Sequence, residues 1–209
     1  MVGNISNKIS FYFQNQLNLD EEDREVIEYG SFVVIGGFFK VMMLIILGVL
    51  FGVLKYALII ATTFALFRTF SGGVHANTYK GCMILTMTLF IGSSMFIKIF
   101  ENNINYSVLM LFIAFIIIYS IYSIVRFVPK DTPNRVISDS NEKKKFKKIT
   151  SYLFIIYTCS MLACLYYKVE YTFVLAGFIG IFMQMVLLHP ISYRVVNRFD
   201  NIIKRGILK

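Results

Sequence analysis

Apolar residues in this chain are grouped into six runs that are separated by shorter polar stretches. The runs cover approximately residues 31–54, 56–67, 82–100, 106–125, 149–167 and 171–189. An α-helix needs about 20 apolar residues to cross a hydrocarbon core about 30 Å thick, and most of the runs approach or reach that length. The pattern therefore predicts an all-α integral membrane protein with about six transmembrane helices.

The first 30 residues follow a different pattern. Four apolar residues recur every four positions with polar residues between them, which predicts a short amphipathic helix on the membrane surface. These four residues are Ile5, Ile9, Phe13 and Leu17. The acidic residues 20–23 are placed to cap a second helix that leads into the bilayer, although a solvated acidic linker also fits them. A basic start followed by a compact apolar region is missing, so we expect no signal peptide.

Composition supports the membrane class, and charge adds an orientation. Hydrophobic residues make up 57% of the 209 residues and charged residues 16%, with a net charge of +9. Most of the lysines and arginines lie between the apolar runs without a nucleic-acid-binding motif, so we expect no nucleic-acid partner. The positive-inside rule instead predicts cytoplasmic N- and C-termini, with the polar stretch 68–81 and the basic loop 126–148 on the cytoplasmic side. One membrane-embedded domain, residues 1–209, is the simplest organisation.

Candidate chemistry is concentrated in the polar stretch 68–82, which contains one of two histidines and one of three cysteines. His75 is a candidate general base, and Cys82 is a candidate nucleophile. A thiol with an ordinary pKa of about 8.5 is mostly protonated at neutral pH, so it needs a base, a cation or a helix N-terminus nearby. This stretch offers His75, the cations Arg68 and Lys80, and an apolar run that begins at Cys82. We therefore expect Cys82 at a helix start, where unpaired N–H groups favour a thiolate.

Spacing requires the chain to turn between these two residues. Positions seven apart on a straight helix are separated by about 10 Å along the axis, which is beyond hydrogen-bond reach. Gly72, Gly73 and the polar residues 77–81 supply the turn chemistry. Both cations have an ordinary interpretation as positive-inside anchors. Their alternative role is to stabilise thiolate or oxyanion charge, or to bind acidic groups of a substrate.

The other unusual residues have simpler explanations. Cys159 and Cys164 lie in an apolar run without a nearby histidine or acid, so packing explains them. The chain has no CxxC pair and no His/Cys cluster, so we expect neither a metal nor a cofactor. His189 is expected near the end of the last helix. Lys40 lies inside the first run, where it either has a function or extends its amino group to the membrane surface.

Four residues of the polar stretch, Arg68, Gly73, His75 and Cys82, match in identity and spacing those of the AgrB family. Members of this family are membrane-embedded cysteine endopeptidases that process quorum-sensing propeptides. Residues 128–137 resemble the proline-and-basic loop of the family, with Val136 at the position of a proline and Arg135 as a candidate basic residue.

The resemblance implies a multi-pass protein of the cell membrane with its active site at the cytoplasmic face. It implies that Cys82 and His75 release the C-terminal tail of an AgrD-like propeptide through an S-acyl-enzyme. The acyl group then passes to an internal cysteine of the propeptide and forms a thiolactone autoinducing peptide. Arg68, Gly73, Lys80 and Arg135 are candidates for oxyanion or substrate binding, and a homodimer is expected.

The alternative function is a small multi-span transporter or channel-like protein, with the His75 loop as a re-entrant element. The absence of two features disfavours this alternative: the sequence shows neither paired broken helices nor an acid inside an apolar run.

The second apolar run is too short for a complete span. Twelve helical residues reach about 18 Å, against a hydrocarbon core of about 30 Å. Either the helix starts before Lys55, or the polar stretch after Phe67 is drawn below the membrane surface. Irregular backbone at that depth is tolerated only where protein or a water-filled cavity surrounds it. We prefer the sunken loop, because it also shelters an acyl intermediate from water.

Overall fold

The computed structural model of the chain is predominantly helical in its described part. Five helices are long and apolar enough to cross a membrane, or six if a bent pair at the C-terminal end counts as one span. Outside the helices, one isolated bridge pairs Gly72 with Lys130. The predicted all-α fold with about six candidate spans is thus confirmed. The structure describes residues 2–74, 76, 78–101, 105–130 and 139–207.

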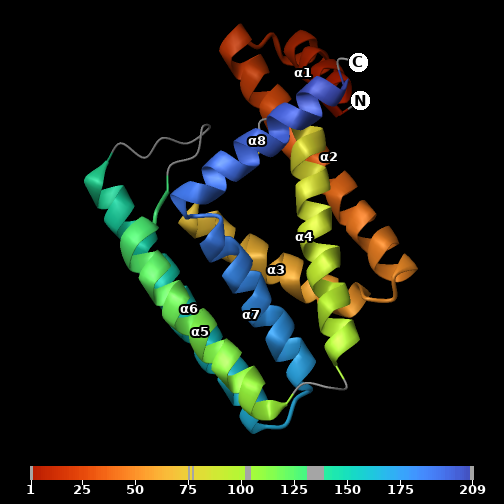
Figure 1. The fold of residues 1–209 in the computed structure, drawn as a ribbon. Helices are drawn as coiled ribbons and strands as arrows, with labels where there is room; N and C mark the ends of the chain where they lie inside the picture. The colour runs from red at the N-terminus through yellow and green to blue at the C-terminus, as the bar shows by residue number, and fades with distance from the viewer. Residues whose placement is uncertain (1, 75, 77, 102–104, 131–138, 208–209) are drawn as a thin grey trace. The chain divides into compact units, whose positions relative to one another are not determined.

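Figure 1 shows the helices in chain order. Their bounds are α1 (Val2–Leu17), α2 (Glu21–Leu50), α3 (Leu54–Ser71), α4 (Tyr79–Phe100), α5 (Tyr106–Phe127), α6 (Ser140–Tyr166), α7 (Tyr171–Val186) and α8 (Pro190–Ile207). The chain divides into two compact units, Met1–Leu47 and Gly48–Lys209, which are described in turn.

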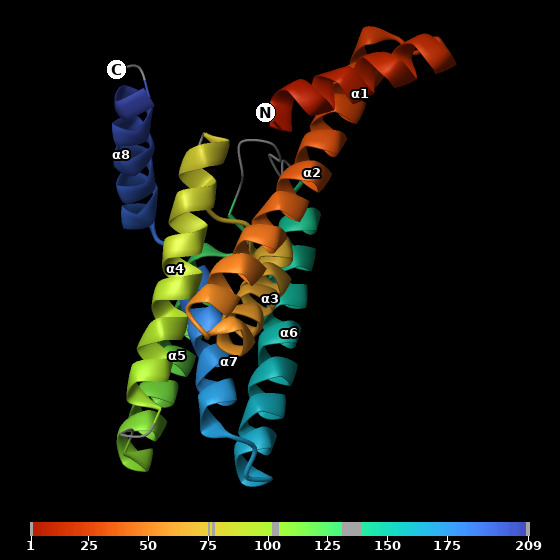
Figure 2. The ribbon, with the colours of Figure 1, turned by 90° about the vertical axis from the view of Figure 1, so that its right-hand side faces the viewer.

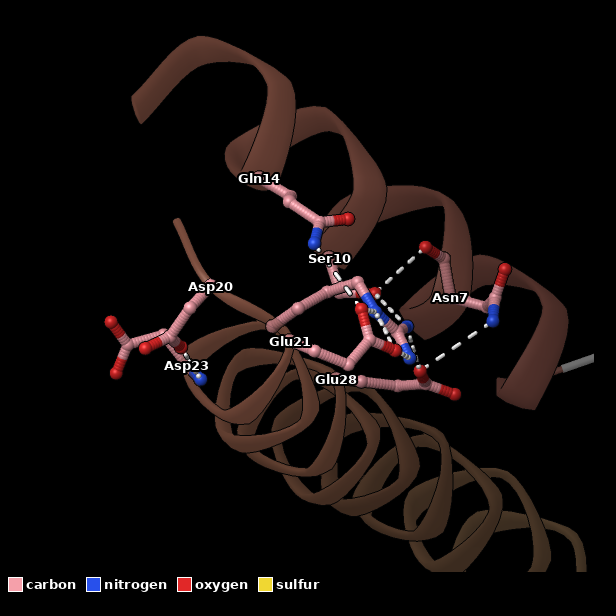
Figure 3. A network of polar contacts seen from close by, with 8 residues as sticks. Asn7, Ser10, Gln14, Asp20, Glu21, Asp23 and Glu28 are labelled. Atoms are coloured by element: carbon pink, nitrogen blue, oxygen red, sulfur yellow. Dashed lines mark hydrogen bonds and ion pairs between the residues drawn. The ribbon is translucent and has the colours of Figure 1, made fainter. Parts of the chain in front are cut away.

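The first unit holds α1 and most of α2, joined by a short acidic turn. The predicted N-terminal helix is confirmed over Val2–Leu17. The predicted acidic cap of the second helix is confirmed too, because the Asp20 carboxylate accepts a 2.8 Å hydrogen bond from the Asp23 N–H. Figure 3 shows polar side chains of α1 facing carboxylates of α2. The Asn7 amide donates to Glu28 at 3.5 Å and the Gln14 amide to Glu21 at 3.3 Å.

Arg24 is the centre of this network and is 9% exposed. Its guanidinium forms ion pairs with Glu21 at 2.6 Å and Glu28 at 2.8 Å on its own helix. Towards α1 it donates to the Ser10 hydroxyl at 3.5 Å and lies 4.7 Å from the centre of the Phe11 ring. One cation therefore joins the two helices of this hairpin through hydrogen bonds and a cation–π contact.

The second unit is built around α7, which contacts α3, α4, α5 and α6. Figure 2 shows α7 between α4 and α6 in the side view. Glycines permit the closest approach, since a Cβ at Gly180 would lie 2.8 Å from the Ile60 carbonyl oxygen and from Thr63. Phe178 and Ile181, two residues before and one residue after Gly180, are fully buried. This tight α3–α7 contact brings the C-terminal end of α3 to the C-terminal end of α7.

The length of α3 corrects the expected second span. The helix starts at Leu54, before Lys55, and continues past Phe67 to Ser71, so its 18 residues reach about 27 Å. The first four residues of the expected polar interruption are therefore helical, and the shortfall in length that motivated the sunken loop disappears. The depth of the loop stays a prediction. The basic run 143–148 also lies within a helix, because α6 begins at Ser140 rather than near 149.

The last predicted span, 171–189, is shorter than expected. α7 ends at Val186, and the chain bends by 86° into α8, which the apolar pattern did not predict. Pro190 is the first residue of α8. Proline is favoured at this position because an N–H there would have no acceptor within the helix, so its absence costs nothing. His189 lies at the bend between the two helices.

Candidate functional site

The loop between α3 and α4 starts with two glycines whose backbone angles require glycine. Gly72 has φ 72° and ψ −149°, and Gly73 has φ 122°. A Cβ at Gly72 would lie 2.1 Å from the Lys130 carbonyl oxygen. The Lys130 N–H in turn donates to the Ser71 carbonyl at 3.0 Å. The start of the loop is therefore paired with the segment that follows α5.

Arg68, near the end of α3, binds the backbone of the same loop through its guanidinium. Its Nη2 donates to the Gly73 carbonyl at 3.3 Å and also to the Val74 carbonyl. Its Nη1 donates to the Gln184 side-chain oxygen of α7 at 3.3 Å, and its guanidinium lies 5.6 Å from the centre of the Phe64 ring. A planar guanidinium with several fixed donors suits this task, because it reaches three acceptors at once.

The end of α7 supplies further contacts to the same loop. The Gln184 side-chain N–H groups donate to the Ser71 hydroxyl at 2.8 Å and to the Gly72 carbonyl at 2.7 Å. The Leu187 carbonyl accepts a 3.3 Å hydrogen bond from the Val74 N–H. Residues from α3, α7 and the segment after α5 together hold the backbone from Ser71 to Val74.

α4 begins at Tyr79, and Thr78 is its N-cap. The Thr78 hydroxyl accepts from the Gly81 N–H at 3.1 Å and donates to the carboxylate of Asp200 on α8. Asp200 is 1% exposed. A Cβ at Gly81 would lie 2.5 Å from Asp200 Oδ1, so glycine lets this carboxylate approach the helix start.

Cys82 is the fourth residue of α4, which corrects its predicted position as the first. Its N–H already donates to the Thr78 carbonyl at 2.9 Å, so this N–H is not one of the unpaired groups at the helix end. The thiol is partly buried, and its sulfur lies 4.0 Å from the Thr86 hydroxyl oxygen. When ionised, it is near enough to the Arg68 guanidinium for the two charges to interact. All three cysteines lie in the described part of the chain and are thiols rather than disulfides.

The predicted site residues fall into three groups. Arg68 and Gly73 are in direct contact, with Cys82 within electrostatic range of Arg68. Lys80 is exposed in the first turn of α4. His75 and Arg135 lie outside the described residues, so their predicted roles stay predictions.

Sequence reasoning missed three residues that hold the site together: Lys130, Gln184 and Asp200. Two of them carried a signal. Gln184 is the one amide inside the last apolar run, and Asp200 is the one acid after that run. A polar side chain that interrupts an apolar helix usually has a buried partner. Lys130 contributes backbone groups, which no side-chain pattern indicates. Among the described residues, no group of three or more histidines, cysteines or acids is placed to hold a metal ion.

Fold and site together define a helical protein compatible with multiple membrane crossings, in which a cysteine in the first turn of a helix follows a loop held by an arginine. The chain belongs to the AgrB family, since the model of the family described as "Accessory gene regulator B" matches residues 6–188.

Relatives support this assignment over most of the chain. An AgrB-like protein of Clostridium perfringens strain SM101 is 28% identical over 96% of this chain and 97% of the relative. A second AgrB-like protein, from C. perfringens strain 13, is 31% identical over 74% of this chain and 75% of its own length. Accessory gene regulator protein B of Staphylococcus lugdunensis is 29% identical over 87% and 90%. No solved structure matches the chain.

Proposed function

We propose that this protein is a membrane cysteine endopeptidase that cleaves the C-terminal tail from an AgrD-like propeptide and cyclises the remaining fragment. The observation that carries the proposal is the position of Cys82 in the first turn of α4, within electrostatic range of the partly buried Arg68 guanidinium. A positive charge and a helix N-terminus both favour the thiolate over the thiol. Membership of the AgrB family supports the same chemistry.

The reaction proceeds in two acyl transfers. His75 accepts the proton of the Cys82 thiol, and the thiolate attacks the scissile carbonyl carbon to form a tetrahedral oxyanion. The C–N bond then breaks, His75 returns the proton to the departing amine, and an S-acyl-enzyme remains. An internal cysteine of the propeptide attacks this thioester, so that a thiolactone forms and the Cys82 thiol is regenerated.

The neighbouring residues divide the supporting roles. Arg68 stabilises the thiolate and orders the loop through the Gly73 and Val74 carbonyls. Gly73 permits that geometry, and Lys80 and Arg135 bind acidic groups of the propeptide tail. The protein works as a homodimer in the cell membrane with both termini and the active site at the cytoplasmic face, where the positive-inside rule places the basic segments.

Variants of the cysteines and of His75 test the proposal in proteoliposomes. Cys82→Ala and His75→Ala should abolish propeptide cleavage without loss of membrane insertion. Cys159→Ala and Cys164→Ala are matched controls, because both thiols lie in α6 away from the loop, and they should retain most activity. Tail release by the Cys82→Ala protein would exclude the mechanism.

A modified propeptide tests the acyl-enzyme directly. When the acceptor cysteine of the propeptide is replaced by alanine, the first transfer proceeds and the second has no thiol to use. An adduct of the N-terminal fragment on Cys82 should accumulate, be visible by mass spectrometry and be released by hydroxylamine, which cleaves thioesters. Tail release with neither this adduct nor faster formation of the hydrolysed fragment would rule out Cys82 as the nucleophile.

A further inference from the structure

Gln184 is a fully buried amide in a helix that is otherwise almost entirely apolar. A glutamine side chain carries two N–H donors and one carbonyl acceptor, and here all three groups are used. The donors reach the Ser71 hydroxyl at 2.8 Å and the Gly72 carbonyl at 2.7 Å, and the acceptor receives the Arg68 Nη1 at 3.3 Å. Every partner belongs to the segment 68–72, which leads directly towards the proposed base and nucleophile.

The bend after α7 adds a second attachment to the same segment. Because the helix stops at Val186, the Leu187 carbonyl lies outside the helical hydrogen-bond ladder and accepts from the Val74 N–H. His75 follows Val74 directly in the sequence. The end of α7 therefore contacts the chain at Arg68, at Ser71 and Gly72, and at the residue that precedes the proposed general base.

We infer that Gln184 is a positioning residue for catalysis, which fixes the backbone before His75 and holds the Arg68 guanidinium against the loop that leads to Cys82. The inference rests on the proposed function, because it assigns a role in the reaction of Cys82. Reacting groups are held within a few tenths of an ångström of their productive geometry, and a displacement of about 1 Å lowers the rate by about 10²-fold. A neutral amide suits the site, since it offers two donors to the loop and an acceptor to Arg68 without adding charge.

A purely structural role for Gln184 makes a different prediction. A buried polar group whose only task is stability affects folding or insertion but leaves the properties of Cys82 unchanged in the protein that does fold. Thr172 provides a matched control, because it is 1% exposed near the start of the same helix, and its hydroxyl contacts Glu170 and Tyr56 rather than the loop.

The experiment compares Gln184→Met, Gln184→Glu and Thr172→Val in a background that lacks Cys159 and Cys164. Two quantities are measured in proteoliposomes: the kcat and KM of propeptide cleavage, and the pH dependence of Cys82 alkylation by iodoacetamide. Gln184→Met removes the amide at similar size, and Gln184→Glu keeps an acceptor but loses both donors. Both should lower kcat about 10²-fold with little change in KM. Both should move the alkylation midpoint to higher pH, whereas Thr172→Val should change neither.

The two measurements separate this inference from the proposed function. If the wild-type protein cleaves no propeptide, the proposed reaction fails, while the alkylation midpoint still reports whether Gln184 controls Cys82. A wild-type midpoint and kcat in folded Gln184→Met, or equal effects in Thr172→Val, would overturn the positioning role. If Gln184→Met does not insert, Ser71→Ala removes one of the two acceptors and should shift the midpoint in the same direction. An unchanged midpoint there would contradict the inference.

Discussion

Replacing Gly72 by alanine is expected to release the loop from the segment after α5. Gly72 has φ 72° and ψ −149°, a region that residues with a Cβ occupy only at a cost of about 1–3 kcal/mol. The new Cβ would also lie 2.1 Å from the Lys130 carbonyl oxygen, so the two backbones have to move apart. The backbone strain alone corresponds to about a 5- to 150-fold rise in the ratio of the open to the paired state.

Hydrogen exchange at Lys130 measures this release, because its N–H donates to the Ser71 carbonyl at 3.0 Å. Mass spectrometry of the peptide that contains Lys130 should show its protected amide exchanging about 5- to 150-fold faster in Gly72→Ala, following the population of the open state. Gly92→Ala is the control, since a Cβ at that helical position meets nothing within 4 Å beyond its chain neighbours and the backbone of its own helix, and it should leave this exchange unchanged. Wild-type protection in correctly inserted Gly72→Ala would refute the reasoning.

Three further predictions concern the helices around the site and the topology. Gly81→Ala places a Cβ 2.5 Å from Asp200 Oδ1, so limited proteolysis should cut α8 faster than in the wild type; equal rates would contradict the contact. Arg24→Met removes the cation between α1 and α2, so spin labels on the two helices should report a broader distance distribution, with Arg24→Lys intermediate; an unchanged distribution in Arg24→Met would argue against its role. For topology, single cysteines on intact cells should resist an impermeant thiol reagent at the predicted cytoplasmic positions and react at the external one, and strong labelling at either cytoplasmic position would overturn the orientation. The positions are Ser140 and Asn201 inside, and Asn103 outside.

The sequence predicted the elements whose signal is local. Apolar runs gave the long helices, because a span needs a continuous apolar surface whatever its neighbours are. The Asp20 cap was predictable for a similar reason, since it satisfies an N–H only three residues away. Boundaries were less accurate where polar residues continue a helix. Arg68 and Ser71 were assigned to a loop, yet both belong to the last turn of α3, where their side chains find partners inside the protein.

The residues that hold the candidate site could not be assigned because their partners are distant in sequence. Gln184 reaches Ser71 across 113 positions, and Asp200 reaches Thr78 across 122. Each residue stood out as a polar exception, but a pattern along the chain gives no information on which loop the exception faces. The bend after α7 was missed for a related reason. The run 171–189 stays predominantly apolar past Val186, so composition did not reveal that the helix stops there.

Buried hydrogen bonds explain why the loop and α7 form one mechanical unit. Moving the backbone of Gly72 away from α7 leaves one of the two Gln184 N–H groups without its acceptor in a fully buried position, which costs about 1–3 kcal/mol. Arg68 donates both to the Gln184 side-chain oxygen and to the Gly73 carbonyl of the loop. A shift of either acceptor therefore changes the hydrogen bond of Arg68 to the other. The position of the Arg68 guanidinium therefore depends on a hydrogen bond to α7, a helix that begins about one hundred residues later in the chain. Substitutions along the α3–α7 contact, such as at Gly180, should consequently displace Arg68 without contacting the Cys82 thiol directly.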